Sequence, residues 1–416
     1  MDKKREQQLP TPPVSPETAA LVSKEWRSYI EPLLPVAERL AGYVTDINDP
    51  QLRREYYRNL YSQISMGFFA LLHADTEHPD MWSYFNQAFN ALAPNPDFDY
   101  YVSPLNDQGV YRISGFRGTV KRIGFQTGTG QFIPRGIVDD QKLGKTLANY
   151  DVDDLTIGPK GEFDVILSPT RPEGHDGDWW ELHPGASYLF VRQMSYDWIN
   201  EIDGRFGIER LDTPAIRPRA TVESLERNLR HIAAWTEGTV KVSADFVPEM
   251  TAGLVSNQIG FVDMLFYGGI FTQRYAYGVI ELEPDEALII ESKVPDESRY
   301  WSFHLLDMFA FTIDWMNRQS SLNGHTATID KDGYFRAVIS EQDPGVPNWL
   351  DNAGYRKSFI QIRWEKCSSW PNHAVKKVKL SELRQHLPAD TAVVTAEQRD
   401  AAIRLRRKGA QMRKRW

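Results

Sequence analysis

The stretch YWSFHLLD, from Tyr300 to Asp307, places a histidine and an aspartate three residues apart at the end of an apolar run. An imidazole that is oriented by a carboxylate can act as a general base near neutral pH. We therefore take His304 and Asp307 as candidate catalytic residues, with Tyr275 as a third proton carrier. The structural alternative is a histidine satisfied by the backbone, with Asp307 capping a turn.

Aromatic and polar side chains that suit a ligand cavity lie on both sides of this stretch. The segment from Phe261 to Gly278 is dense in aromatic residues, and Asn323 lies at a glycine-containing turn. Core packing is the alternative for the aromatic residues, and plain turn chemistry is the alternative for Asn323. The candidate substrate-binding residues are Tyr267, Arg274, Trp301, Trp315, Asn323, Arg192 and Trp179, and we expect Trp301, Tyr267, Tyr275 and Trp315 to form the cavity walls.

The chain contains the same phrase twice. It reads KGEFDVILSPTRPEGHDGDWWELHPGASYLFVR up to Arg192 and DGYFRAVISEQDPGVPNWLDNAGYRKSFIQIRW around Arg363. Each copy has a strand ending in serine, a turn with proline, a tryptophan (Trp179 or Trp349), a glycine, and a strand with arginine. We expect two similar β-units. An arginine and an aromatic wall would hold an oxygen-bearing apolar ligand; in the alternative, tryptophan packs a sandwich and arginine neutralises an acid.

Several common chemistries have no motif in this sequence. Neither GxxxxGK[ST] nor a strand-bound GxGxxG is present, and GxSxG and HExxH are also missing. Cys367 is the single cysteine, so no intrachain disulfide and no zinc site with two cysteines can form. The histidines are scattered. We expect no metal and no cofactor.

The bulk composition is that of a soluble globular protein. The 416 residues are 41% hydrophobic and 25% charged, which predicts two or three packed units. A net charge of −8 argues against nucleic acid as a partner, and no run of 18 uncharged apolar residues predicts a membrane span. The amino terminus has no apolar signal region. We expect a cytoplasmic homo-oligomer that acts on a small molecule.

The hydrophobic pattern divides the chain into six parts. Spacings of three and four predict helices up to about residue 93, including one over residues 79–92, and a period of two predicts short strands from residue 100 onward. The basic last helix suits an acidic partner subunit, nucleic acid or a membrane surface. The parts are a disordered leader (1–16), a helical region (17–95), a first β-unit (96–220), a helical connection (221–268), a second β-unit (269–366) and a tail with the basic helix (367–416).

The second β-unit resembles the family named domain of unknown function 1214. The phrases that carry the resemblance are PDEALIIESKVPDESRYWSFHLLD, RQSSLNGHTATIDKDGYFRAVISEQDPGVPNWLDNAGYRKSFIQIRW and, upstream, GDWWELHPGASYLFVRQMSYDW. PNPDFDYY and VYRISG resemble the amino-terminal, companion 1254-type part of such proteins. The resemblance covers roughly residues 95–364. It implies a largely β fold with a helical insertion and implies no particular reaction.

These observations lead to one fold and two functions. The fold is mainly β with helical additions (α+β): two antiparallel β-sandwich or jelly-roll-like units with an amino-terminal helical region and a helical connection. The first function is a cofactor-independent lyase or hydrolase acting on a small apolar, aromatic, hydroxylated or carbonyl-bearing substrate between the units. The alternative is a noncatalytic β-sandwich that binds carbohydrate or lipid, or that builds an oligomer.

Overall fold

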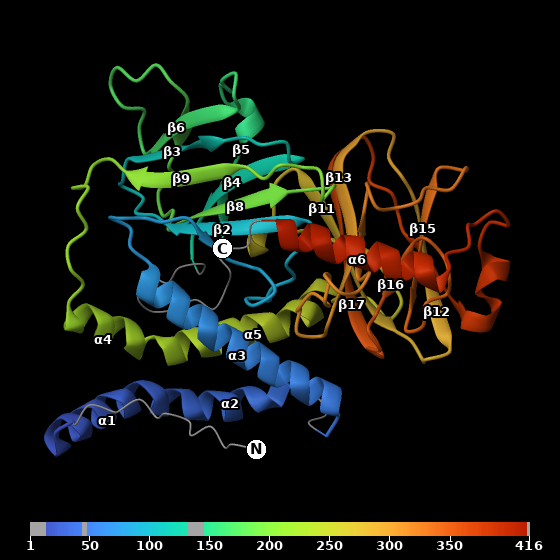
Figure 1. Cartoon of the computed structure of the whole chain (residues 1–416), viewed down its shortest axis with the longest axis horizontal. Helices are drawn as coiled ribbons and strands as arrows, with labels where there is room; N and C mark the ends of the chain where they lie inside the picture. The colour runs from blue at the N-terminus through green and yellow to red at the C-terminus, as the bar shows by residue number, and fades with distance from the viewer. Residues whose placement is uncertain (1–13, 44–47, 131–144, 414–416) are drawn as a thin grey trace, which may run out of the picture.

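A computed structural model of the chain describes residues 14–43, 48–130 and 145–413 (Figure 1). Residues 1–13 of the predicted disordered leader lie outside the described residues, and Ser15 caps the first helix by accepting a hydrogen bond from the Thr18 backbone. No helix of the described part is long and apolar enough to span a membrane. The α-helices in these ranges are α1 (Pro16–Ile30), α2 (Leu34–Leu40), α3 (Pro50–His73), α4 (Val222–Arg230), α5 (Ile232–Met250) and α6 (Ala396–Met412).

The first β-unit consists of two sheets. A five-stranded sheet has the order β1-β2-β8-β4-β5, and a four-stranded sheet has the order β7-β6-β3-β9. All neighbours are antiparallel except β6 and β7. The strands are β1 (Trp82–Ser83), β2 (Phe98–Pro104), β3 (Tyr111–Phe116), β4 (Arg122–Gly128), β5 (Thr146–Asp151), β6 (Glu162–Ser168), β7 (Trp179–Glu181), β8 (Tyr188–Met194) and β9 (Arg205–Arg210).

The second β-unit, at the right of Figure 1, is built in the same way. Its five-stranded sheet has the order β10-β11-β17-β13-β14, and its four-stranded sheet has the order β16-β15-β12-β18. β15 and β16 are the parallel pair. The strands are β10 (Gly260–Val262), β11 (Gln273–Glu281), β12 (Glu286–Lys293), β13 (Ser298–Leu306), β14 (Ser321–Asn323), β15 (Tyr334–Ser340), β16 (Trp349–Asp351), β17 (Lys357–Cys367) and β18 (Ala374–Lys379).

The strand orders show an internal duplication. Each strand of the first unit corresponds to the strand nine places later in the second unit, in both sheets. Trp179 pairs with Ile166 beside Ser168, and Trp349 pairs with Val338 beside the equivalent serine of β15. The two tryptophans of the repeated phrase therefore occupy equivalent positions. The predicted fold class, mainly β with antiparallel sheets and added helices, is confirmed.

Each five-stranded sheet has one face in a sandwich core and its other face turned towards the opposite unit and the helices. This follows from the alternation of side chains along a strand. On β13, Trp301 and Phe303 lie in the apolar core of the second sandwich. Tyr300, Ser302 and His304 point the other way and are buried between the units. These outward faces of the two large sheets position the candidate site.

Helices α3 and α5 cover this region (Figure 1). Asp49 starts α3 by accepting backbone hydrogen bonds from Gln51 and Leu52. The two helices approach closely at Gly67, where an added Cβ would lie 2.8 Å from the Trp235 ring. Trp235 belongs to the same apolar cluster as residues of β2 and β8. Burial of this helical layer against the sheet closes the space between the units.

The helix predicted over residues 79–92 does not form. Trp82 and Ser83 instead pair with β2, and Asn86 accepts hydrogen bonds from the backbone of Ala88 and Phe89. A short polar side chain that binds its own following backbone competes with helix formation. The prediction was wrong because the apolar residues of this segment pack on the sheet instead of following one helix face.

Helix α6 crosses the front of the molecule and docks on its own chain (Figure 1). Thr395 and Gln398 form a capping box at its start. Near its end, Arg406 and Arg413 lie over the Trp198 ring, at 4.6 and 5.5 Å from the ring centre. Several of the basic residues that suggested an external partner are therefore used within the chain.

Candidate functional site

Two buried arginines hold the same position in the two β-units. Arg192 of β8 lies opposite Tyr100 of β2, and Arg363 of β17 lies opposite Tyr275 of β11. These strand pairs correspond to each other in the duplicated order. Arg192 is 9% exposed and Arg363 is 6% exposed. Each unit thus contributes one buried arginine and one tyrosine at the same place.

Arg192 is held by neutral oxygen atoms and an aromatic ring. Its guanidinium donates hydrogen bonds to the side-chain oxygen of Gln126, on β4, and to the carbonyl oxygen of Gly268 at 2.7 Å. It lies 4.5 Å from the centre of the Phe190 ring. Gly268 has a φ of 74°, a left-handed conformation that glycine adopts without strain. These contacts fix the guanidinium in one orientation.

Arg363 is held in a similar way, and some of its contacts cross to the first unit. Its Nε and Nη2 donate to the side-chain oxygen of Gln361, at 2.9 and 2.6 Å. Nη2 also donates to the Ala93 carbonyl oxygen at 3.1 Å, and Nη1 lies 3.5 Å from the Tyr100 phenol oxygen. The Phe98 ring lies 5.2 Å away. Arg363 therefore links β17 to the first unit.

Neither guanidinium forms an ion pair with a carboxylate of the described residues; their acceptors are amide, carbonyl and phenol oxygens. Burial lowers the pKa of Arg192, and the charge of Arg363 adds to this effect, whereas Tyr275 and Tyr100 oppose it. Burial also lowers the pKa of Arg363, but the surrounding tyrosines outweigh it and the net change is upward. Uncompensated buried charge costs several kcal/mol, so these two groups favour an anionic ligand.

Both arginines line a cavity of about 50 Å³ between the two large sheets. This is more than one buried water needs. The arginines form a polar part of its lining together with Gln361. The aromatic residues that line it are Phe85, Tyr100, Phe190, Phe246, Tyr267 and Tyr275. The site combines aromatic walls with fixed positive charge.

Three of the predicted site residues meet in this cavity: Arg192, Tyr267 and Tyr275. The Tyr275 phenol oxygen accepts a hydrogen bond from the Ile270 backbone N–H at 3.1 Å. Burial raises the pKa of Tyr275, although Arg363 and Arg192 act against this effect. Tyr275 is therefore a neutral phenol at physiological pH and can donate its own proton to a ligand.

His304 and Asp307 are not arranged as a base with its orienting acid. His304 is fully buried, and the polar side chain that interacts with its ring is that of Gln361 on β17, not that of Asp307. Burial, followed by the charge of Arg363, lowers its pKa well below the usual range. Since β13 continues to Leu306, Asp307 lies beyond the strand and accepts backbone hydrogen bonds from Phe309 and Phe311. This is the turn-capping alternative, and Asp307 lines a different cavity.

The predicted tryptophans lie away from the cavity between the units. Trp301 packs in the second sandwich core, on the opposite face of β13 from His304. Trp315 clusters with Met316 and Ala410 of α6. Trp179 donates its ring N–H to Ser168 in the outer sheet, at 3.0 Å. Because side chains alternate between the two faces of β13, Trp301 lies in the apolar sandwich core. It therefore does not form a wall of the cavity, as had been predicted.

Arg274 and Asn323 also lie elsewhere. Arg274 is exposed and its guanidinium is 5.8 Å from the Trp370 ring centre. Asn323 accepts backbone hydrogen bonds from the turn that follows it and donates to Asp97 at 2.8 Å. Asp97 also accepts from Tyr300 at 2.7 Å. Asn323 thus combines turn chemistry with a buried polar network.

Few of the other cavity residues could be predicted from sequence patterns. Arg363 had one signal, because it repeats the position of Arg192 in the duplicated phrase. Tyr100 and Phe190 had no such signal, since their roles depend on which sheet face meets the opposite unit. Register within a strand pair can be inferred from alternation, but the packing partner of the outward face cannot.

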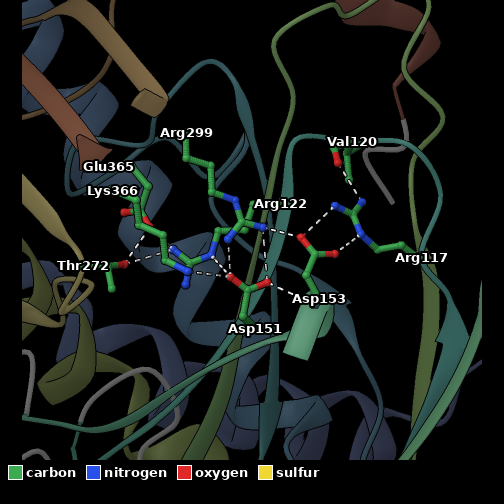
Figure 2. A network of polar contacts seen from close by, with 9 residues as sticks. All are labelled: Arg117, Val120, Arg122, Asp151, Asp153, Thr272, Arg299, Glu365 and Lys366. Carbon is green, nitrogen blue, oxygen red and sulfur yellow. Dashed lines mark hydrogen bonds and ion pairs between the residues drawn. The ribbon is translucent and has the colours of Figure 1, made fainter. Parts of the chain in front are cut away.

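A buried ion-pair network joins the two units beside this cavity, and Figure 2 shows its members. Arg122 of β4 donates to Asp151 at 2.9 Å and to Glu365 of β17 at 2.5 Å. Arg299 of β13 also donates to Asp151, at 2.5 Å. Burial raises the pKa of Asp151, but Arg122 and Arg299 outweigh this and lower it. The network fixes the relative position of the two large sheets.

Potential metal ligands are not gathered among the described residues. They contain no group of three or more His, Cys, Asp or Glu side chains that could hold a metal ion. Cys367 is a free, half-buried thiol. Burial and the nearby Glu365 raise its pKa to about 12, so it is not a reactive thiolate at neutral pH. The chemistry of the described site is that of arginine and phenol groups.

Comparison with known proteins finds a solved structure of similar architecture. The solved structure of an uncharacterized protein from Burkholderia cenocepacia is similar, with a TM-score of 0.77 and 26% identity, over 88% of this chain and 99% of that one. A protein from Vibrio parahaemolyticus has a TM-score of 0.44 and 14% identity, over 78% of this chain and 98% of that one. No curated protein matches the chain.

The family match lies in the second β-unit. Residues 282–364 match the family described as "Protein of unknown function (DUF1214)". This range extends from the residue after β11 into β17, and it includes Arg363, His304 and Asp307. The resemblance read from the sequence of the second β-unit is thereby confirmed over residues 282–364, where this chain is similar to the DUF1214 family.

Proposed function

We propose that the protein binds a small organic acid with a flat apolar body between its β-units and acts on it as a lyase or hydrolase. The observation that carries the proposal is the convergence of Arg192 and Arg363, both buried and both without a carboxylate partner among the described residues. A carboxylate is the ligand that a guanidinium binds most specifically, through paired hydrogen bonds.

The aromatic lining supports a ligand with an apolar body. The rings of Tyr100, Phe190 and Tyr275 lie around the guanidinium groups and offer faces for stacking. Polar groups that fix orientation within a mostly apolar cavity are typical of sites for small molecules. The small volume favours an acid of one ring or less over a sugar chain or a lipid tail.

The same groups suit chemistry on the bound acid. Lyase and hydrolase steps both build negative charge on a substrate oxygen, and fixed positive charge in a dry site stabilises that charge strongly. The Tyr275 phenol, which burial keeps protonated, is positioned to supply a proton. In this proposal the arginines hold and stabilise the oxygen atoms, and Tyr275 is the proton donor.

The proposal is tested by thermal unfolding of the full chain with a panel of ligands. Benzoate, 4-hydroxybenzoate and phenylacetate are compared with the uncharged benzamide and benzyl alcohol. A ligand at 100 times its Kd stabilises the folded state by about 2.7 kcal/mol, which is readily measured. We expect the acids to raise the Tm and the neutral analogues to leave it unchanged. Product formation from each stabilising acid is then followed by mass spectrometry.

The Arg363→Met variant removes the charge and keeps an apolar side chain of similar length. It should lose the stabilisation by acids, whereas Arg274→Met, a change at an exposed position of β11, should keep it. Equal stabilisation of Arg363→Met and wild type would disprove the proposed site. Stabilisation without turnover would favour the noncatalytic binding function.

The expectations of a cytoplasmic location and of homo-oligomer formation remain part of this proposal. Helix α1 buries none of its residues, and Leu21, Val22 and Trp26 are each more than half exposed. An exposed apolar helix face is typical of a surface that pairs with another chain. Light scattering of the purified protein, compared with a Trp26→Glu variant, tests whether copies of this chain pair through α1.

A further inference from the structure

The two halves of the arginine cavity repeat each other in more than their arginines. The Tyr100 phenol oxygen of β2 accepts a hydrogen bond from the backbone N–H of Asn95, five residues earlier, at 2.8 Å. The Tyr275 phenol oxygen of β11 accepts the equivalent bond from Ile270, also five residues earlier, at 3.1 Å. Because each phenol oxygen is the acceptor in this bond, its hydroxyl hydrogen remains available to a ligand in the cavity that both tyrosines line.

The contacts that cross between the units are equivalent as well. Arg363 donates to the carbonyl oxygen of Ala93 in the first unit, and Arg192 donates to that of Gly268 in the second unit. Each of these carbonyl groups lies seven residues before the cavity tyrosine of its own unit. Both residues have a left-handed backbone, with φ values of 59° and 74°. Each arginine therefore reaches across to the same point of the opposite repeat.

The two guanidinium groups lie near each other. Tyr100 is directly opposite Arg192 in its own sheet, and its phenol oxygen is 3.5 Å from Nη1 of Arg363. Tyr275 is directly opposite Arg363, and its ring centre is 5.6 Å from Cζ of that arginine. Burial lowers the pKa of Arg192, and the nearby charge of Arg363 lowers it further. One phenol thus separates two fixed positive charges.

The charges of the cavity are not balanced by its own lining. The described lining contains both arginines and no aspartate or glutamate. Glu365 lies two residues after Arg363 on β17, but it accepts hydrogen bonds from Arg122 and Thr272 in the network of Figure 2. A ligand with one carboxylate would compensate one guanidinium and leave the other unpaired, which is unfavourable in a buried site. A ligand with two carboxylates would compensate both.

We propose that the arginine site recognises a dicarboxylic acid, and that each repeat supplies one arginine and one phenol to one carboxylate. This inference rests on the proposed function and narrows its organic acid to a dianion. Guanidinium groups bind carboxylates through paired, charge-assisted hydrogen bonds, and a phenol hydroxyl adds a further donor. Because Tyr100 lies beside both arginines and the shared cavity is only about 50 Å³, the two carboxylates are carried on neighbouring carbon atoms of the flat body.

A series of matched acids tests this inference on the full-length wild-type protein. Isothermal titration calorimetry at about pH 7.5, where carboxyl groups are ionised, compares benzene-1,2-dicarboxylate with its monomethyl ester, its 1,4-isomer and benzoate. We expect the 1,2-diacid to bind on the order of 100-fold more tightly than benzoate, because it forms a second set of charge-assisted hydrogen bonds. The monomethyl ester has nearly the same shape but one charge, and the 1,4-isomer directs its carboxylates apart. Both should bind no better than benzoate.

Variants in both repeats show whether each half holds one carboxylate. Arg192→Met and Arg363→Met should each lower the affinity for the 1,2-diacid by on the order of 100-fold or more, because one carboxylate loses its charged partner. Tyr100→Phe keeps the ring and removes the hydroxyl group, so it should lower that affinity by about 10-fold. Arg274→Met, at an exposed position of β11, should match wild type. Circular dichroism confirms that each variant is folded, and the comparison of acids on wild type does not depend on the variants.

The outcomes separate this inference from the proposed function. If benzoate binds and the 1,2-diacid binds no more tightly than its monomethyl ester, the site takes a single carboxylate; the dicarboxylate inference is then wrong, while the proposed acid site stands. If the 1,2-diacid binds equally well to wild type and to folded Arg192→Met or Arg363→Met, that half holds no carboxylate and the inference is overturned. If no acid binds wild type, the proposed function fails and this inference fails with it.

Discussion

Arg192 and Arg363 are equivalent residues of the duplicated β-units, and each lies directly opposite a tyrosine in its own sheet. Their immediate partners differ. Arg192 donates a hydrogen bond to Gln126 of the neighbouring strand, whereas Arg363 donates to Gln361 of its own strand. In the second unit, His304 occupies the position that Gln126 has in the first, as the strand registers show. The duplication therefore produced two similar but non-identical halves of one site.

The two arginines should act on the same ligand and not on two separate ligands. We expect Arg192→Met and Arg363→Met each to abolish stabilisation by benzoate, and the double variant to lose no more than either single one. Residues that act as a unit give strongly non-additive effects. Isothermal titration calorimetry of the four proteins measures this. Additive losses, with weak binding left in each single variant, would indicate two independent sites.

His304 should make the folded protein sensitive to acid. Its folded-state pKa is well below the usual value of 6.5, so its stabilising contribution is complete above that pH and is lost as the pH falls below it. We expect His304→Gln, which copies Gln126, to reduce the loss of unfolding free energy below pH 6.5 by about 1.4 kcal/mol per pH unit. Urea unfolding at a series of pH values checks this. An unchanged slope would show that His304 is not a neutral buried group.

The network of Figure 2 should be a major stabilising link between the units. Arg122→Met leaves Glu365 and Asp151 with less compensation in a buried site, where the side chain of Glu365 is 0% exposed. Removing one member of a buried ion pair costs about 3–5 kcal/mol. The control is Arg112→Met, which breaks two exposed pairs and should cost less than about 1 kcal/mol. Equal urea midpoints for the two variants would contradict this prediction.

The end of helix α6 should be important for stability, in contrast to its exposed middle. Arg413 donates to the carbonyl oxygens of Pro96 and Asp97 and pairs with Asp99 at 3.0 Å. Burial raises the pKa of Asp99 to about 6, and Arg413 acts against this effect. We expect Arg413→Met to cost about 3 kcal/mol of unfolding free energy and to raise the Asp99 pKa further.

Arg404→Met on the same helix is the matched control for that variant. Arg404 is 70% exposed and pairs with Asp400 in the preceding turn of the helix. Its removal should cost less than about 0.5 kcal/mol. Chemical denaturation of both variants measures the difference, and a similar loss in both would mean that α6 is only loosely attached.

The sequence by itself determined the duplicated β-architecture and the positions of the tryptophan and arginine residues that the two copies share. Alternating apolar residues predict strands locally, and the repeated phrase already places Trp179 with Trp349 and Arg192 with Arg363. The same kind of local pattern wrongly predicted a helix over residues 79–92. There, hydrogen bonding by an Asn side chain and pairing with β2 are favoured over the helix. Local preference is a weak guide where packing on a sheet competes with it.

Tertiary structure alone decided which side chains meet. Strand alternation separates Trp301 from His304, but only the packing of the two large sheets shows that the face with His304 meets the other unit. Glu55 and Tyr355 are 300 residues apart, so no local pattern connects them. Contacts of this kind form when a helix and two β-units dock. Their energies depend on burial and charge in the assembled molecule, which short-range sequence patterns do not contain.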